Sequence, residues 1–201
     1  MIEVRFPDQS TRSYAHGITP FEIAKSISEG LARNVLSVKF NGQTVEASTP
    51  LKNDGKINLF TWNDKEGKTA FWHSSAHVLA QALLALYPAC KLTIGPAIEN
   101  GFYYDADFGE HSITEKDLVI IEKKMLEFAR QKFDFKMRSI SKSEALAHYQ
   151  KENNPFKIEL IENLEDGTIT FCDHADFTDL CRGGHIPQTG VIKAVKLTNV
   201  A

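Results

Sequence analysis

The stretch Val35–Val45, with the sequence VLSVKFNGQTV, decides the fold of the first part of the chain. Its first half, Val35 to Phe40, is rich in residues that favour strands. Asn41-Gly42 follows, a strong signal for the tight turn of a β-hairpin, and Val45 resumes the apolar pattern. The stretch therefore predicts two antiparallel strands joined by a short turn.

The residues before this hairpin predict a second pair of strands. Ile2, Val4 and Phe6 alternate with other residues, as expected for a half-buried strand. Pro7-Asp8 then turns the chain into another strand, which ends near Tyr14.

A helix is expected between the two strand pairs. Thr19 suits the N-cap, Pro20 suits the first helical position, and Gly30 is placed to end the helix. Its buried face is expected to contain Phe21, Ala24 and Ile27. The last strand contains Ile57, Leu59 and Phe60. The order strand, strand, helix, strand, strand over residues 1–62 predicts a ubiquitin-like β-grasp domain.

Residues 63–201 predict a second domain, of the α+β class. Asn63–Thr69 is polar and resembles a linker or a solvated helix entry, so the domain boundary is placed there. Helices are predicted from about Ala70 to Leu86, from Thr114, and after the capping box Ser141–Glu144. The candidate strands are Phe102–Tyr104, Phe135–Ile140, Ile158–Ile161, Thr168–Cys172 and Val191–Leu197, with Asp166-Gly167 as a hairpin turn between two of them.

Composition limits the class of protein. The 201 residues carry 23 basic and 26 acidic side chains, and this net charge of −3 does not by itself indicate a nucleic-acid partner. No apolar run approaches the length of a membrane span, and Met1–Arg5 enters a strand pattern rather than a signal peptide. Three cysteines are too few, and odd in number, for a disulfide framework, which favours a reducing cytoplasm.

Two pairs of ionisable side chains share a spacing of four positions. His73 and His77 form the first pair, and Cys181 and His185 form the second. Four positions make about one helical turn, so both members of a pair can face one point. If the fold brings the pairs together, the cluster could hold a zinc ion or move protons around a hydrolytic water. Ser74 follows His73, which excludes the metalloprotease signature because that motif needs a glutamate there.

The residues around the second pair suit the binding of an anion. Gly183 and Gly184 let the backbone approach a ligand closely and offer N–H groups, and Arg182 could contact phosphate. Asp179 adds a carboxylate that could orient a histidine or bind a substrate amine. Either motif taken alone is also compatible with an ordinary structural role.

Three ordered motifs resemble those of the bacterial threonyl-tRNA synthetases. They are HSSAH at residues 73–77, GPAIENGFYYD at residues 95–105 and DLCRGGHIP at residues 179–187. The resemblance covers the whole chain and implies a TGS domain over residues 1–62. It implies an editing domain, of a kind shared with alanyl-tRNA synthetases, over residues 63–201. Two positions depart from the family pattern: Trp72 stands where arginine is common, and Gly184 where proline is common.

The resemblance implies hydrolysis of serine wrongly attached to threonine tRNA. The implied catalytic residues are His73, His77, Lys157, Asp179, Cys181 and His185. His73 would position or activate water, Asp179 would hold the ammonium group or a histidine, and Lys157 would stabilise the oxyanion or the ribose end. The implied substrate-binding residues are Tyr104, Arg182 and Gly183.

The resemblance also sets the expected partners and cofactors. The partner would be the acceptor end of threonine tRNA carrying serine, with no membrane involved. In the family the class II ligase core, with its ATP-binding motifs and zinc site, lies beyond this segment. We therefore expect no threonine activation and no cofactor here, since zinc and Mg-ATP belong to that core. The full-length enzyme would be a homodimer and the present segment, an N-terminal fragment of it, a monomer.

Three alternatives stay open from the sequence. His73, His77, Cys181 and His185 meet the ligand count of a closed zinc site, as in the alanyl branch of the family. The chain could instead be a non-catalytic RNA-binding or regulatory fragment, because TGS domains also occur in GTPases and stringent-response proteins. A cysteine nucleophile is weaker, because no short-range Cys–His dyad with an orienting group is evident.

Overall fold

The computed structural model describes residues 1–200 and divides into two compact units. The first unit contains Met1–Phe71 together with the short segment Gly183–Pro187. The second contains Trp72–Arg182 and residues 188–200. The first unit thus extends past the polar stretch at residues 63–69 and includes a segment from far along the chain. Within residues 1–200, no helix combines the length and the apolar character needed to cross a lipid bilayer.

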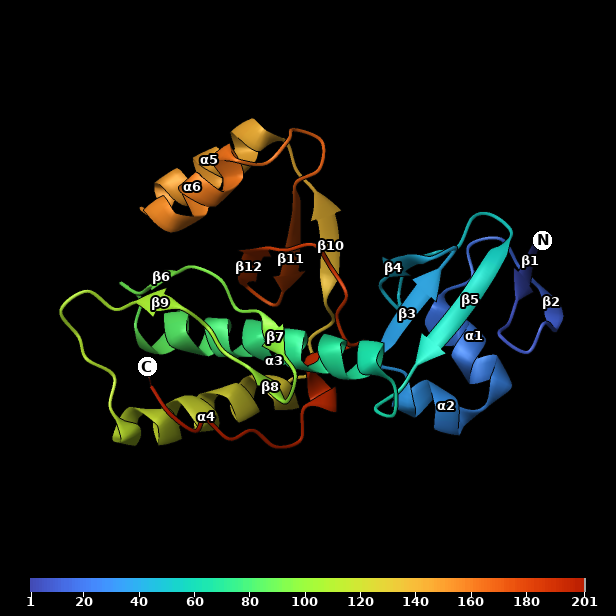
Figure 1. The fold of residues 1–201 in the computed structure, drawn as a ribbon, viewed down its shortest axis with the longest axis horizontal. Coiled ribbons are helices and arrows are strands. Elements are labelled where there is room, and N and C mark those ends of the chain that lie inside the picture. The colour runs from blue at the N-terminus through green and yellow to red at the C-terminus, as the bar shows by residue number, and fades with distance from the viewer. Residues whose placement is uncertain (201) are drawn as a thin grey trace. The chain divides into compact units, whose positions relative to one another are not determined.

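The first unit is built on a five-stranded sheet with the strand order β2-β1-β5-β3-β4 (Figure 1). Its strands are β1 (Ile2–Arg5), β2 (Thr11–Tyr14), β3 (Ser37–Phe40), β4 (Gln43–Val45) and β5 (Gly55–Phe60). β1 and β5 pair in parallel, and the other neighbours pair antiparallel. Asn41 and Gly42 turn the β3–β4 hairpin with φ angles of 51° and 79°, as the sequence predicted. The predicted β-grasp fold is confirmed.

Two short helices, rather than one, cover this sheet. α1 (Pro20–Ile27) begins with the predicted Thr19 cap, in a capping box with Glu22. The helix ends at Ser28, whose hydroxyl caps α2 (Glu29–Asn34), so Gly30 lies inside α2 and does not end α1. The predicted buried face was also partly wrong, because Phe21 and Ile27 are exposed while the buried residues of α1 are Pro20, Ile23 and Ala24.

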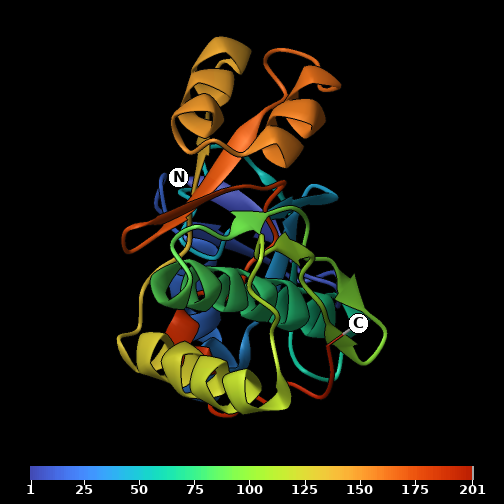
Figure 2. The ribbon, with the colours of Figure 1, turned by 90° about the vertical axis from the view of Figure 1, so that its left-hand side faces the viewer.

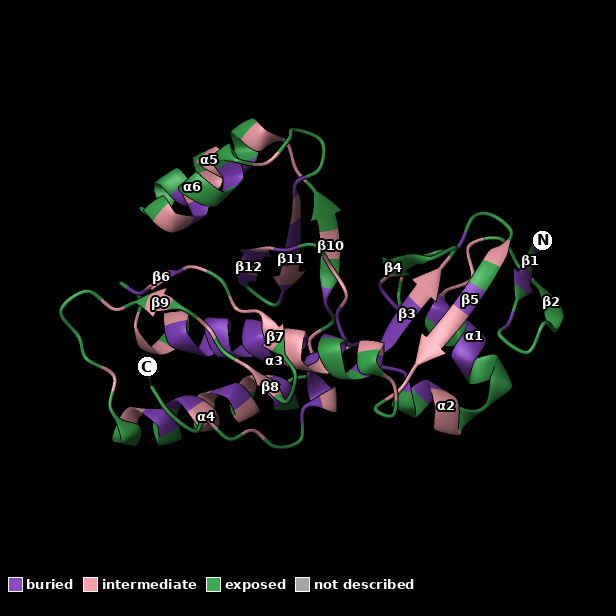
Figure 3. Ribbon diagram, viewed as in Figure 1, coloured by how far each residue is buried: buried purple, intermediate pink, exposed green. Residues whose placement is uncertain are grey.

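Helix α3 (Lys65–Leu86) is the longest element, and its residues from Trp72 onward belong to the second unit. It begins five residues before the predicted Ala70, so the polar stretch is largely a helix entry. Helix α4 (Glu115–Arg130) lies alongside it in both views (Figures 1 and 2). Thr114 and Asp117 form the expected capping box, and Leu118, Ile121 and Met125 of α4 are buried. Figure 3 shows that burial covers most of the middle of α3 and alternates with exposed residues along α4.

A three-stranded antiparallel sheet, β10-β11-β12, completes the scaffold of the site. Its strands are β10 (Lys136–Ser139), β11 (Thr170–His174) and β12 (Phe177–Leu180). α5 (Lys142–Lys151), capped by Ser141 as predicted, packs against α6 (Pro155–Glu162). A short 3-10 turn, Thr189–Val191, contacts α4.

Three predictions for this region were wrong. Ile158–Ile161 lies in α6, because Asn154 caps a helix that starts at Pro155. Val191–Leu197 forms no strand. The β11–β12 hairpin turns at Ala175 and Asp176, not at Asp166-Gly167, which connects α6 to β11.

Two further pairs of short strands lie beside α3. β6 (Lys91–Leu92) pairs with β9 (Ala106–Asp107), and β7 (Ala97–Ile98) pairs with β8 (Gly101–Phe102). Of the predicted strand Phe102–Tyr104, only Phe102 lies in an observed strand, and Tyr104 lies in the connection from β8 to β9.

Candidate active site

The middle of α3 carries two histidines on one side. Every residue from Ser74 to Leu83 is buried, which is typical of a helix packed on all sides. The rings of His73 and His77 stand edge to face, with centroids 4.8 Å apart. His77 is only 3% exposed, whereas His73 is partly exposed. Of this pair, His73 is therefore the one that a bound molecule can reach more readily.

Strand β12 presents Asp179 and the following Cys181 on one face. Alternate residues of a strand point the same way, and Phe177, Asp179 and Cys181 are all buried. The Sγ atom of Cys181 lies 3.1 Å from Nε2 of His73, within hydrogen-bonding distance for sulfur. The thiol and the partly exposed imidazole thus form a direct pair between the residue that follows β12 and helix α3.

The carboxylate of Asp179 is the centre of a buried polar network. Lys157 Nζ donates to its Oδ1 at 2.5 Å, and both side chains are almost fully buried. Tyr104 Oη donates to Oδ2 at 2.8 Å, and Tyr149 Oη donates to Oδ1 at 3.3 Å. His77 Nδ1 lies 3.9 Å from Oδ2. A buried carboxylate needs such partners, because a lone charge in the interior is costly.

The two tyrosines of this network act as neutral donors. Burial, followed by the negative charge of Asp179, raises the pKa of Tyr104 well above its ordinary value. The same two causes raise the pKa of Tyr149. Both phenols therefore keep their protons at neutral pH and hold the carboxylate by hydrogen bonds.

His185 is held by a carboxylate that belongs to the same compact unit. Its Nδ1 lies 3.1 Å from Oε1 of Glu46, and its backbone N–H donates to Oε2 at 3.3 Å. The N–H of Gly184 donates to Oε1 at 3.0 Å. His185 is 1% exposed, so its ring is fixed by these contacts and by packing.

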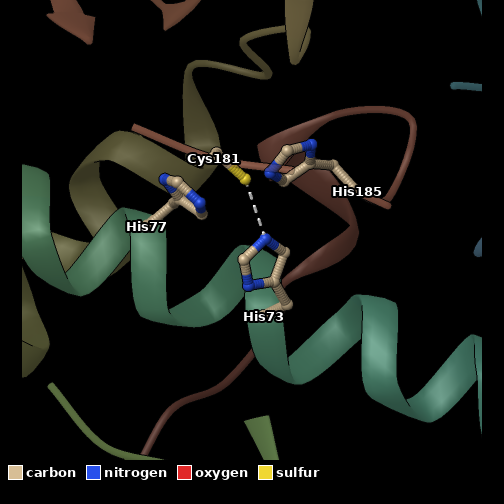
Figure 4. Close-up of side chains that lie close together, drawn as sticks. All are labelled: His73, His77, Cys181 and His185. Carbon is tan, nitrogen blue, oxygen red and sulfur yellow. Dashed lines mark hydrogen bonds between the residues drawn. The ribbon is translucent and has the colours of Figure 1, made fainter. Parts of the chain in front are cut away.

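The two predicted pairs come together (Figure 4). One nitrogen or sulfur atom from each of His73, His77, Cys181 and His185 lies within 4.8 Å of the others. His73 is partly exposed and the other three are buried. The figure shows His73 and His77 on α3, and the dashed line marks the bond from His73 to Cys181. Three imidazoles and a thiol at these distances fit the donor set of a tetrahedral zinc ion as well as that of a proton-transfer site.

The remaining predicted residues occupy different settings. Lys157 lies in α6 and is 2% exposed. Tyr104 contacts Asp179, and Arg182 is exposed. Gly183 has a φ of 89°, in the left-handed region that favours glycine. The roles of these residues stay predictions.

The two departures from the family pattern have local explanations. Trp72 stacks on Phe102, with ring centroids 6.3 Å apart. Gly184 has a φ of 88° and donates its N–H to Glu46. Proline has a fixed φ near −65° and no N–H, so it could not make this conformation or this bond.

Sequence reasoning missed three residues of the site. Glu46 reaches His185 across 139 positions, and a lone glutamate after a strand carries no motif. Tyr149 accepts the Leu180 N–H at 2.8 Å while it donates to Asp179, but it resembles a core residue of an amphipathic helix. Asn154 caps α6 and donates to the Leu92 carbonyl at 2.9 Å, and only its place before Pro155 could have identified it.

A glycine contact offers a test of how Tyr104 is held. A Cβ atom at Gly95 would lie 2.2 Å from Cδ2 of Tyr104. We expect Gly95→Ala to push this ring away from Asp179 and to cost about 1–3 kcal/mol of stability, as overpacking does. Urea unfolding would measure the loss. Gly30→Ala is the control, because its nearest atom is 3.8 Å away in a helix, so it should be neutral or stabilising. Equal stability of Gly95→Ala and the unmodified chain would show that the ring is free to move.

Two family models and several curated relatives match the chain. The model of the TGS domain matches residues 2–61, and the model of the threonyl and alanyl tRNA synthetase second additional domain matches residues 169–200. Threonine–tRNA ligase of Flavobacterium johnsoniae is 64% identical over 201 residues, which is 100% of this chain and 31% of the relative. The enzymes of Flavobacterium psychrophilum and Cytophaga hutchinsonii are 59% and 56% identical over the same shares.

The chain thus spans 31% of the length of the curated relatives that it matches. The resemblance seen in the three motifs extends over all 201 residues. With matches to a TGS domain and to a second additional domain in one chain, this sequence is homologous over its whole length to threonine–tRNA ligases.

Proposed function

We propose that this chain carries the site that hydrolyses serine mischarged onto threonine tRNA. The single observation that supports this most is the partly exposed His73, bonded to the buried thiol of Cys181. A base that can reach both water and substrate, backed by buried polar groups, suits the hydrolysis of an ester. The proposal gives the editing role to the second additional domain.

The chemistry of the two amino acids explains why such a site is needed. Serine is smaller than threonine by one methyl group, and a pocket that accepts threonine cannot strongly exclude serine. One missing methylene is worth only about 1–3 kcal/mol of discrimination. A second site can instead admit the serine ester and reject the threonine ester by a steric clash with its methyl group.

The proposed reaction needs a water, a base and support for negative charge. His73 takes a proton from water while the water oxygen attacks the ester carbonyl. The tetrahedral intermediate then expels the ribose oxygen, which receives the proton from His73. Serine and uncharged tRNA are the products, so atoms and protons balance.

The buried network has a supporting role in this proposal. Asp179 is already bonded to Lys157, Tyr104 and Tyr149, and it lies 3.9 Å from Nδ1 of His77. We propose that it keeps His77 oriented and contributes the local negative charge that attracts the substrate ammonium group. Arg182, which is exposed, is proposed to contact a phosphate of the acceptor end.

The same reaction defines a tRNA substrate, a cellular compartment and an oligomeric state for the chain. The substrate is the acceptor end of threonine tRNA in the cytoplasm, where three cysteines can stay reduced. We propose that this segment is a monomer and that the longer enzymes of the family are homodimers. Removal of serine from the wrong tRNA then supports accurate attachment of threonine.

The experiment compares two substrates. Serylated and threonylated threonine tRNA are incubated with the chain, and loss of the ester is followed against a sample without protein. We expect the serine ester to be lost and the threonine ester to survive. A short acceptor-end mimic at saturating concentration guards against weak binding of the whole tRNA. Binding without turnover of either ester would support the alternative of a non-catalytic RNA-binding fragment.

A zinc site is the second candidate function, favoured by the four donor atoms within 4.8 Å of one another. His73, His77, Cys181 and His185 would hold the ion in a closed structural site, whereas three of them would leave one position open for an activated water. We propose that the site works without metal, because the relatives are threonine–tRNA ligases and the family resemblance implies zinc only for the alanyl branch. Elemental analysis of purified protein is expected to give zinc far below one ion per chain. Stoichiometric zinc that is lost in the His77→Ala variant would overturn this.

A further inference from the structure

Glu46 is a buried carboxylate at the end of β4 that the proposed reaction does not yet use. Its side chain is 8% exposed. The carboxylate accepts the backbone N–H groups of Gly184 and His185 and lies within hydrogen-bonding distance of Nδ1 of the His185 ring. All of these residues belong to the first compact unit. A carboxylate this buried is satisfied only by such a set of donors. The contact therefore ties the Gly183–Pro187 loop to the β-grasp sheet.

The backbone around Glu46 is itself held in place. The N–H of Thr49 donates to the Glu46 carbonyl at 3.0 Å, and the N–H of Phe21 donates to the Ala47 carbonyl at 2.9 Å. Ala47 is 4% exposed and belongs to the core of the β-grasp domain. The carboxylate thus projects from a fixed point of the scaffold, not from a mobile surface loop.

The bond to the ring determines which nitrogen of His185 carries hydrogen. An ionised carboxylate can only accept, so Nδ1, at 3.1 Å from Oε1, must be the donor. In the neutral imidazole the lone pair is then on Nε2. Without Glu46, nothing in this contact would choose between the two tautomers. Second-sphere carboxylates of this kind commonly set the tautomer and orientation of functional histidines.

We propose that Glu46 is a positioning residue for the editing reaction, acting through His185. It locks the ring as the Nδ1–H tautomer, so that Nε2 presents its lone pair within the histidine–thiol cluster. It also fixes the left-handed turn at Gly183 and Gly184, whose φ angles are 89° and 88°. This rests on the proposed function of the cluster.

The tautomer can be observed directly. Uniformly ¹⁵N-labelled protein gives two imidazole nitrogen signals for His185, assigned by their loss in His185→Gln. We expect the unmodified chain to show a protonated Nδ1 and an unprotonated Nε2. Glu46→Ala should shift these signals toward a mixture of tautomers. Glu46→Gln should largely keep them, because its amide oxygen can still accept from Nδ1 and from the Gly184 N–H.

Kinetics provide the second measurement. We expect Glu46→Ala to lower kcat for serine-ester hydrolysis by about 10–100-fold, the usual scale for an orienting partner, with little change in KM. If Glu46 acts through His185, then adding Glu46→Ala to His185→Ala should cause no further loss. Additive effects of the two substitutions would overturn the proposal.

A matched control separates positioning from stability. Glu22 is another glutamate of the first unit that accepts backbone N–H bonds, in the capping box of α1. Glu22→Ala should lower the free energy of unfolding slightly and leave the His185 signals and kcat unchanged. If the unmodified chain hydrolyses neither ester, the proposed function fails. The nitrogen spectra still decide the role of Glu46, and unchanged signals in Glu46→Ala would refute it.

Discussion

Replacing His73 by alanine should lower hydrolysis of the serine ester by roughly 10²-fold or more, within the range expected for a general base. His73 is the member of the cluster that is partly exposed, while His77, Cys181 and His185 are buried. A base must reach both the attacking water and the ester, so exposure selects His73 from the four. Initial rates with a saturating acceptor-end mimic would measure the effect.

Substitution of the neighbouring thiol distinguishes two roles for Cys181, a group that shapes the pocket and a nucleophile. Cys181 Sγ lies 3.1 Å from Nε2 of His73, so this contact positions the ring. If the thiol only shapes the pocket, Cys181→Ala should weaken hydrolysis without abolishing it. Complete loss in Cys181→Ala, with a serine-thioester intermediate trapped at low pH, would instead identify a nucleophile. The threonine ester should survive with every variant.

His16 provides the control for the histidine substitution. It lies exposed in a loop of the first unit, away from any cluster, and His16→Ala should keep the full rate. A His73→Ala rate equal to that of the unmodified chain would show that His73 is structural. Lys157 would be a poor replacement as base, since it is 2% exposed and its amine is bonded to Asp179.

The sequence predicted well those elements whose signals are local. Each of these signals depends on residues within a few positions of one another. They are the Asn41-Gly42 turn, the helix caps at Thr19, Thr114 and Ser141, and the alternation of buried and exposed residues in β1. Predictions from local signals were wrong where a second residue nearby could end or begin the same helix equally well. Ser28 ends α1 and caps α2, so the chain did not need Gly30 as a terminator.

The hairpin between β11 and β12 shows the limit of turn motifs. Asp166-Gly167 has the stronger turn signal, and Asp166 does accept N–H bonds from Lys142 and Gly167. The strands nevertheless turn at Ala175, a non-glycine residue with a φ of 52°. Pairing of β11 with β12 stabilises this unfavourable angle, and sequence offers no local mark of that pairing.

The site was predictable only where spacing encoded it. The two pairs of site residues could be recognised because the members of each pair are four positions apart, so that one helical turn or one loop brings them together. The partners that orient them come from elsewhere in the chain. Glu46 and Tyr149 are single polar residues, 139 and 30 positions from the groups that they hold, and only the fold reveals them.

Removing the charge of Lys157 should strongly destabilise the second unit. Its amine lies 2.5 Å from Asp179 Oδ1, with the two side chains 3% and 5% exposed. Lys157→Met would leave Asp179 buried without its counter-charge. Breaking one side of such a pair typically costs about 3–5 kcal/mol, which equilibrium urea unfolding would measure. Lys196→Met is the control, because Lys196 pairs with Glu122 while its own side chain is 72% exposed. Loss of such an exposed ion pair should cost about 1 kcal/mol or less.

A double substitution separates the structural part of this pair from its part in editing. Lys157→Met with Asp179→Leu replaces both charges by apolar groups, which often restores the stability lost by breaking a buried ion pair. Tyr104 and Tyr149 would lose their shared acceptor, and this limits the recovery. If Asp179 orients His77 and attracts the substrate ammonium group, hydrolysis of the serine ester should stay at least about 10-fold down even in a variant that folds stably. A refolded double variant with the full rate would show that the pair serves the fold alone.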